Sequence, residues 1–145
     1  MITKLKSRTM IADAATIAYN KIYVNGQWQD NGISQPVLLI STEMELEEVQ
    51  TMLLAFVANV DEDHIKKNRY DFNEKERVME AAQIISSQPL YVEVIPDFSL
   101  KDIENTIKRS IRIHGVKYVF NKKDCVTLFL LITGVYINNN TYYIC

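Results

Sequence analysis

Three short, predominantly apolar segments constrain the fold of this chain more than any other feature of its sequence. They are Val37–Ile40, Leu90–Ile95 and Val116–Phe120. A strand with one face in water alternates apolar and polar residues, whereas a strand covered on both faces is apolar along its length. Stretches with helical periodicity separate the three segments. This alternation predicts an α/β fold, in which a mainly parallel sheet carries helices on both faces.

Apolar spacing, capping residues and chain breakers predict where the helices lie. Ser99 and Asp102 form a capping-box variant at the start of one helix, and Gly115 ends that helix. Asp61 is predicted to cap a short helix. In chain order, the expected helices run from Ser7 to about Ile22, from after Glu43 to about Asn59, from Asp61 to Lys66, from after Asn73 to Pro89, and from Ser99 to Gly115.

Length, charge and cysteine content limit the class of protein. The 145 residues are enough for one domain with a substantial core, and the formal net charge is −2. This charge gives no global basic field that would by itself predict nucleic-acid binding. Cys125 and Cys145 favour a reducing compartment over a disulfide framework, and no signal-peptide pattern is visible, so we expect a cytoplasmic protein. No metal-ligand spacing surrounds His64 or His114, so no metal site is predicted there.

The C-terminal segment, residues 121–145, differs in composition from residues 1–120. No charged residue occurs from Cys125 to Cys145, where CVTLFLLITGVYI is followed by NNNTYYIC. This apolar run of thirteen residues is shorter than the ~20 that a membrane-spanning helix requires, so we expect no membrane anchor. We expect a short strand pair or an irregular tail, whose uncharged sequence favours self-association. The predicted organisation is therefore a core over residues 1–120 and a divergent apolar tail over residues 121–145.

The carboxylate of Glu43 falls where the strand Val37–Ile40 ends and a helix begins. In parallel sheets, ligands bind beyond the carboxyl ends of the strands. A carboxylate at such an end can orient and polarise the water that attacks the γ-phosphate of a bound nucleotide. An acid near a helix N-terminus is also favoured by the helix dipole alone. The position of Glu43 therefore predicts either a catalytic carboxylate or a helix-stabilising one.

The order of motifs up to Phe120 resembles that of a known family. PVLLISTEM is followed by ELEEVQTMLLAFVANVDEDHIKKNRYDFNEKERVMEAAQIISS and then by QPLYVEVIPDFSLKDIENTIKRSIRIHGVKYVF. This order of elements is similar to the ATPase core of DnaB-type replicative DNA helicases. It consists of a strand ending in a serine-containing turn with Glu-Met, then helices, a second strand, a capped helix and a third strand. The resemblance covers about Lys6 to Phe120 and implies a partial RecA-like core. It also implies that Glu43 is the catalytic residue that activates water for ATP hydrolysis.

The same resemblance implies a nucleotide site near the N-terminus. The family has a Walker A loop, G-x-x-x-x-G-K-[ST], before its first helix, and here the opening reads MITKLKSRTM. Lys6 and Ser7 match the final pair, whereas Leu5 stands at the last glycine. The resemblance implies ATP and Mg²⁺ as cofactors, Lys6 and Ser7 as nucleotide-binding residues and the Ser7 hydroxyl as a metal ligand. The family's Mg²⁺-holding Asp after the third strand is replaced by Asn121.

Two hypotheses from different classes follow. The first is a truncated or degenerate DnaB-like helicase fragment whose ancestral activity is ATP-driven DNA unwinding. It implies single-stranded DNA and helicase subunits as partners. The second is a non-catalytic α/β interaction module that docks on a full-length helicase or another replication protein. The glycine-free opening and Asn121 both favour a chain that is inactive alone, so the sequence leaves enzymatic activity open.

Overall fold

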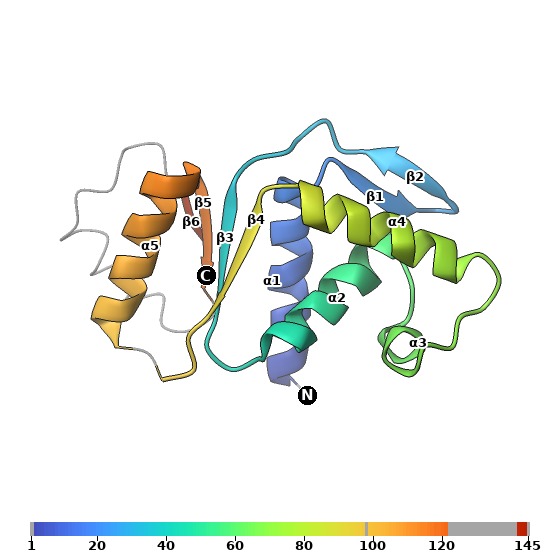
Figure 1. Ribbon diagram of the computed structural model, residues 1–145, viewed down its shortest axis with the longest axis horizontal. Helices are drawn as coiled ribbons and strands as arrows, with labels where there is room; N and C mark the ends of the chain where they lie inside the picture. Colours follow the sequence, from blue (N-terminus) through green and yellow to red (C-terminus); the bar gives the residue numbers. More distant parts are fainter. Residues whose placement is uncertain (1, 98, 122–141, 145) are drawn as a thin grey trace.

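A parallel sheet forms the centre of the computed structural model, which describes residues 2–97, 99–121 and 142–144. The order of its four strands is β4-β3-β5-β6, and every neighbouring pair is parallel (Figure 1). Helices cover both faces of this sheet, so the predicted α/β fold is confirmed. The strands are β3 (Val37–Ser41), β4 (Leu90–Val94), β5 (Tyr118–Asn121) and β6 (Tyr142–Ile144).

The helices divide into two layers. Three of them, α1, α2 and α4, lie on one face of the sheet, and α5 lies on the other (Figure 1). The short helix α3 connects α2 to α4 at the outside of the larger layer. The helix bounds are α1 (Ile2–Ala18), α2 (Leu46–Ala58), α3 (Glu62–Lys67), α4 (Glu74–Ser87) and α5 (Leu100–His114).

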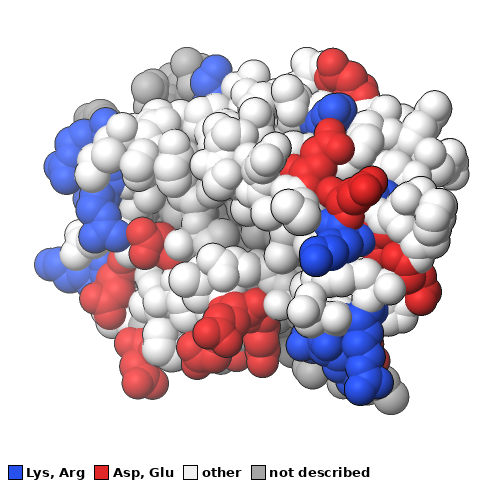
Figure 2. All heavy atoms as spheres, turned by 45° about the vertical axis from the view of Figure 1, so that its right-hand side comes forward, with Lys and Arg blue, Asp and Glu red and all other residues white. Residues whose placement is uncertain are grey.

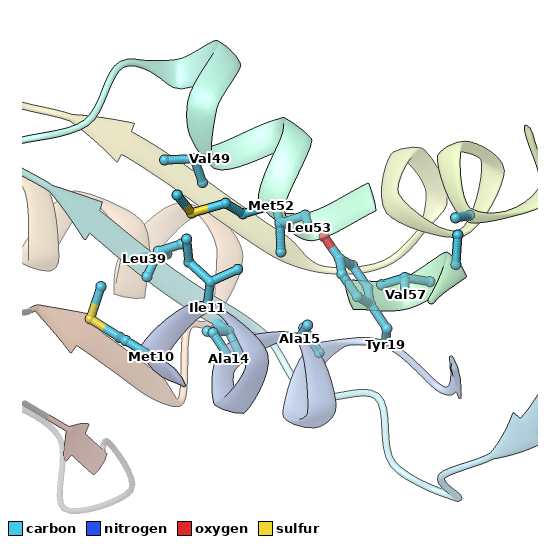
Figure 3. Packing of buried hydrophobic residues seen from close by; sticks show 14 of the residues in the cluster. Met10, Ile11, Ala14, Ala15, Tyr19, Leu39, Val49, Met52, Leu53 and Val57 are labelled. Atoms are coloured by element: carbon cyan, nitrogen blue, oxygen red, sulfur yellow. The ribbon is translucent and has the colours of Figure 1, made fainter. Parts of the chain in front are cut away.

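Alternate residues of β3 point into two separate cores. Leu39 belongs to the larger core, together with Ile11 of α1 and Leu53 of α2 (Figure 3). Leu38 and Ile40 belong to the smaller core beneath α5. All five residues of β3 are buried, because alternate side chains point to opposite faces of the sheet and helices cover both faces. This two-sided burial explains why the sequence of the strand shows no polar alternation.

The first helix differs from its predicted bounds. The structure places α1 at Ile2–Ala18, so the expected range from Ser7 to about Ile22 is wrong at both ends. The helix stops early because later polar side chains take its last carbonyl groups. Within α1, the side-chain amide of Asn31 donates to the carbonyl oxygen of Thr16 at 3.2 Å, and the Ser34 hydroxyl donates to that of Ala18 at 3.0 Å. The same amide donates to the carbonyl oxygen of Tyr19, just after the helix, at 2.8 Å. These hydrogen bonds satisfy carbonyl groups that a continuing helix would have used.

The residues after α1 form an antiparallel hairpin that the sequence analysis did not predict. Strand β1 (Lys21–Val24) pairs with β2 (Gln27–Asp30) across a two-residue turn. Asn25 and Gly26 occupy that turn with φ of 52° and 79°. Two consecutive positive φ values match the right-handed twist of a hairpin, and Asn-Gly is the dipeptide that best tolerates them. The dipeptide was available in the sequence as a hairpin signal, but no hairpin was predicted from it.

The predicted helix caps are confirmed. The Asp61 carboxylate accepts a hydrogen bond from the backbone N–H of Asp63 at 2.8 Å, at the start of α3. Ser99 and Asp102 form the reciprocal capping box of α5. Hydrogen bonds from Ser99, first from its backbone N–H, lower the pKa of the Asp102 carboxyl. Gly115 ends α5 in the left-handed conformation at φ 63°. These local signals fix helix ends without help from distant residues.

The described part of the C-terminal segment joins the sheet. Tyr142–Ile144 forms β6, which pairs in parallel with β5 through Tyr118 to Phe120. The strand pair predicted for the apolar run lies mostly in residues 122–141, outside the described residues. Self-association of this segment stays a prediction. Among the described residues, no helix combines the length and the hydropathy that crossing a bilayer requires.

Candidate functional site

The candidate site lies at the carboxyl edge of the sheet. In the parallel register, Ile40 of β3 is opposite Asn121 of β5, and Ser41 is opposite Val94 of β4. The turn that carries Glu43 therefore lies at the same edge as the end of β5, as predicted from parallel topology. The first turns of α1 lie at this end of the sheet as well (Figure 1). This edge is where α/β sheets bind ligands.

A serine hydroxyl holds the turn that presents Glu43. The Ser41 hydroxyl donates to the carbonyl oxygen of Met44 at 2.9 Å and accepts from the Met44 backbone N–H at 3.1 Å. The Ser41 carbonyl oxygen accepts from the backbone N–H of Ile95 at 2.8 Å, which ties the turn to the end of β4. Glu43 lies within the bend that Ser41 closes, and its side chain is exposed. The sequence therefore builds a fixed turn that carries an exposed acid.

Acidic side chains gather where β3 passes into α2. Two glutamates occupy the first turn of α2, and the two that precede it are exposed in the connecting bend. Figure 2 shows an acidic patch at the lower edge of the molecule, over this part of the fold. Neighbouring carboxylates produce a negative potential that repels polyphosphate and nucleic-acid backbones. The four residues are Glu43, Glu45, Glu47 and Glu48.

Lys6 and Ser7 lie inside α1 rather than before it. The helix begins at Ile2, so both residues follow the four N-terminal positions whose N–H groups lack a helical partner. A Walker A loop requires free backbone N–H groups around the phosphates and a hydroxyl within reach of Mg²⁺. Ser7 is only 2% exposed. The helical backbone and the buried hydroxyl do not fit a binding site for ATP and Mg²⁺.

Asn121 ends β5, where the resemblance to DnaB-type helicases implies an Asp that holds Mg²⁺. The residue is 1% exposed and lies opposite Ile40 of β3. A neutral amide supplies an oxygen but no negative charge, whereas Mg²⁺ is usually bound through one or two carboxylates and waters. Asp124, the next acid in the chain, lies outside the described residues. Among the described residues, β5 therefore ends in a neutral amide and not in an acid.

The fold defines the class of protein. The parallel sheet with helices on both faces is similar to the RecA-like ATPase domain of DnaB helicases. The family model of the DnaB-like helicase C terminal domain matches residues 4–122, and the chain belongs to this family.

One relative and two solved structures place the chain further. It is 34% identical over 117 residues to the SPbeta prophage-derived uncharacterized protein YorI of Bacillus subtilis (strain 168), a match that covers 79% of this chain and 23% of the relative. A solved ATPase domain has a similar fold, with a TM-score of 0.60 and a sequence identity of 16%. The match covers 75% of this chain and 45% of the solved one. A DnaB-like replicative helicase, solved in a study of its interactions with primase, gives a TM-score of 0.53 and 19% identity over 67% of this chain and 26% of its own. The chain thus spans about a quarter of its curated relative.

The structure also contains a groove that the sequence analysis did not predict. It has a volume of about 440 Å³ and lies between α2, α4 and β4. Tyr19 lines it from beneath, and Figure 3 shows the tyrosine oxygen pointing toward α2. The periodicity of a single helix could not reveal this groove, because two helices and a strand form it together. Its apolar lining includes Leu46, Leu53, Leu54, Ile85, Leu90 and Val92.

We predict that Tyr19→Phe stabilises the protein. The Tyr19 side chain is 0% exposed, and its hydroxyl has no hydrogen-bond partner among the described residues. Burial also raises the pKa of this hydroxyl, so it remains a neutral phenol. Removing an unsatisfied buried hydroxyl should increase the free energy of unfolding by about 1 kcal/mol. Urea denaturation of both proteins measures this change, and a loss of stability would show that the hydroxyl is hydrogen-bonded in solution.

Proposed function

We propose that this chain is a DnaB-like helicase ATPase-domain fragment that does not hydrolyse ATP by itself. Glu43 occupies the position of the catalytic carboxylate, and Lys6 and Ser7 are remnants of the phosphate-binding pair. The observation that carries the proposal is the buried, neutral Asn121 at the end of β5, beside the strand that leads to Glu43. The sheet thus retains the family's carboxyl edge without the charges that would hold a metal-bound nucleotide there.

Electrostatics supports the same conclusion. Phosphoryl transfer depends on positive groups and metal ions that neutralise the charge developing on the phosphates. Here the turn after β3 carries Glu43 and Glu45, and the first turn of α2 carries Glu47 and Glu48. ATP brings further negative charge to this edge. The described part of the chain shows neither a glycine-rich loop nor an Asp at the end of β5 that would offset this repulsion.

The biological setting follows from the family. A domain of this kind acts in DNA replication, in the cytoplasm, beside helicase subunits and single-stranded DNA. The chain matches the ATPase domain but spans only part of the relatives, so we propose that helicase subunits, rather than DNA alone, are its principal partners. The net charge of −2 supports this choice, because it gives the chain no general attraction for nucleic acid.

A nucleotide-binding titration tests the proposal. We expect isothermal titration calorimetry to detect no saturable binding of ATP with Mg²⁺ to the isolated chain at millimolar concentrations. Asn121→Asp should be titrated in parallel, because it returns the acid that the family uses. A dissociation constant of the wild-type chain below about 1 mM, equivalent to about −4 kcal/mol, would contradict the proposal. So would wild-type binding that Lys6→Ala abolishes.

A second candidate function is a non-catalytic interaction module that docks on a full-length helicase or another replication protein. The groove between α2, α4 and β4 favours it, since an apolar groove is a common docking surface for another polypeptide. Sedimentation velocity of the chain mixed with a full-length DnaB-like helicase distinguishes the two functions. A stable complex that needs no nucleotide supports the module, and self-association alone supports neither.

A further inference from the structure

Three potential metal ligands from separate parts of the chain meet at the outer end of the larger helical layer. His64 comes from α3, Asp71 from the connecting loop and Glu74 from the first turn of α4. The Nδ1 atom of His64 lies 2.9 Å from Oε2 of Glu74 and 4.0 Å from Oδ2 of Asp71. One ligand atom from each residue lies within 4.8 Å of the other two. The sequence analysis assigned no site to His64, because the three residues share no familiar motif spacing.

The backbone around these residues is held by short-range hydrogen bonds. The carbonyl oxygen of His64 accepts from the backbone N–H of Arg69 at 2.9 Å, where the chain leaves α3. The carbonyl oxygen of Asp71 accepts from the backbone N–H of Glu74 at 3.2 Å, where the chain enters α4. Both ends of the loop are therefore fixed relative to the helices. The three side chains are brought together by the fold rather than by a chance contact at a free end.

The exposure of the three side chains forms a gradient. The Glu74 side chain is 12% exposed, that of His64 36% and that of Asp71 80%. A cation at this position would have one partly enclosed carboxylate, a half-buried imidazole and an accessible second carboxylate. Asp71 can rotate to complete the coordination because little packs against it. The open side leaves room for water as a further ligand.

The surrounding charges favour a cation. The carboxylates of Glu74, Asp71 and Asp61 all place negative charge near His64. On α4, Arg77 directs its guanidinium at the carbonyl oxygens of Ala58 and Asn59, both at 3.1 Å. Arg77 also lies over the ring of Tyr23, 4.6 Å from its centre. It is therefore engaged away from Asp71.

We propose that His64, Asp71 and Glu74 form a binding site for one divalent transition-metal ion of the Zn²⁺ type. One imidazole nitrogen with two carboxylates suits Zn²⁺, Co²⁺ or Ni²⁺, whereas Mg²⁺ and Ca²⁺ prefer oxygen ligands throughout. Tetrahedral Zn²⁺ with ligand bonds of about 2.1 Å separates its ligand atoms by about 3.4 Å. The observed separations of 2.9 and 4.0 Å bracket this value, so rotation of Asp71 and a small shift of Glu74 produce the geometry.

The ion would replace the hydrogen bond between His64 and Glu74 with a bridge that joins α3 to α4. Its coordination takes the lone pair of Nδ1, so His64 carries its ring proton on Nε2 in the bound form. The bridge would fix the short helix α3 against the larger layer of the fold. This inference concerns α3 and α4 and does not depend on the proposed function at the end of β3.

Calorimetric titration of the chelator-treated protein with ZnCl₂ and CoCl₂ tests the site. We expect saturable binding at one ion per chain, with MgCl₂ at the same concentration giving none. His64→Asn and Asp71→Asn should each weaken Zn²⁺ binding more than tenfold, since each removes a direct ligand. Asp71→Asn is the cleaner variant, because the carboxylate is exposed and its loss should leave the fold intact by circular dichroism.

Two controls separate this site from other metal-binding groups. His114→Asn alters a histidine that stacks on Tyr91, with ring centres 3.8 Å apart, and should leave Zn²⁺ affinity within about twofold of wild type. A chain carrying Cys125→Ser and Cys145→Ser removes both thiols, and it should retain the one-ion binding. The proposal is overturned if the wild-type chain binds no Zn²⁺, if either ligand variant binds as tightly as wild type, or if the thiol-free chain loses the binding.

Discussion

The isolated chain is expected to hydrolyse ATP at less than about 10⁻³ per second, because typical enzymes turn over about 10 times per second and each lost electrostatic contribution costs about 10²–10³. Two such contributions differ from the family here. Lys6 and Ser7 lie in the second turn of α1, and Asn121 ends β5 where the family resemblance implies an acid. Single-stranded DNA should not raise the rate.

The measurement is phosphate release from the purified chain, with and without single-stranded DNA and at two concentrations of Mg²⁺. Glu43→Gln serves as the matched variant, since it removes the charge of the candidate catalytic residue and keeps its shape. We expect the two proteins to give the same background rate. A wild-type rate near one per second that Glu43→Gln abolishes would establish an active ATPase and would refute the proposal of an inactive fragment.

Those parts of the fold that depend on local sequence could be predicted. The buried strand at Val37–Ile40, the caps at Asp61 and Ser99 and the stop at Gly115 all appear where the sequence places them. Each depends on residues within a few positions of one another, and so each leaves its pattern in a short window. The shared edge of Glu43 and the end of β5 then follows from the parallel topology alone.

Two of the features that sequence analysis missed depend on contacts beyond a short window of the sequence, unlike the β1–β2 hairpin, whose Asn-Gly signal is local. The end of α1 is set by Asn31 and Ser34, which lie beyond the hairpin and take the helix's last carbonyl groups. Helical periodicity continues through Ile22, so the pattern gave no reason to stop at Ala18. The meeting of His64 with Glu74 likewise requires the loop between α3 and α4 to turn the chain back. Such contacts are tertiary, and propensity does not encode them.

The candidate site shows the same division. The sequence places Glu43 correctly at a strand end, because that position needs only the strand and its turn. Whether the edge binds a nucleotide depends on where the first helix begins, and the structure starts α1 at Ile2 instead of Ser7. A difference of five positions moves Lys6 and Ser7 from a helix entrance into its second turn. Motif matching alone does not detect such a shift, since it compares amino-acid types and not backbone conformations.

Leu39→Ala is expected to lower the free energy of unfolding by about 3–4 kcal/mol, within the range measured for leucine truncation in protein cores. Leu39 is 0% exposed at the centre of β3 and packs in the larger core between α1 and α2 (Figure 3). Small domains are stabilised by only about 5–15 kcal/mol in total, so this single change should shift the urea midpoint strongly. The cost has two parts, the lost burial of the side chain and the cavity that remains.

Leu100→Ala is the matched control, because it makes the same truncation at a leucine that is 47% exposed on the first turn of α5. Its effect should stay within about 0.5 kcal/mol, as for most surface substitutions. Both variants replace leucine with alanine, so the difference between their losses of unfolding free energy measures the effect of burial. A cost below about 1 kcal/mol for Leu39→Ala would mean that the site collapses around the smaller residue or that α1 does not pack there. Repeating the measurement with Ile11→Ala separates these explanations, because Ile11 is the α1 side chain that packs in the same core.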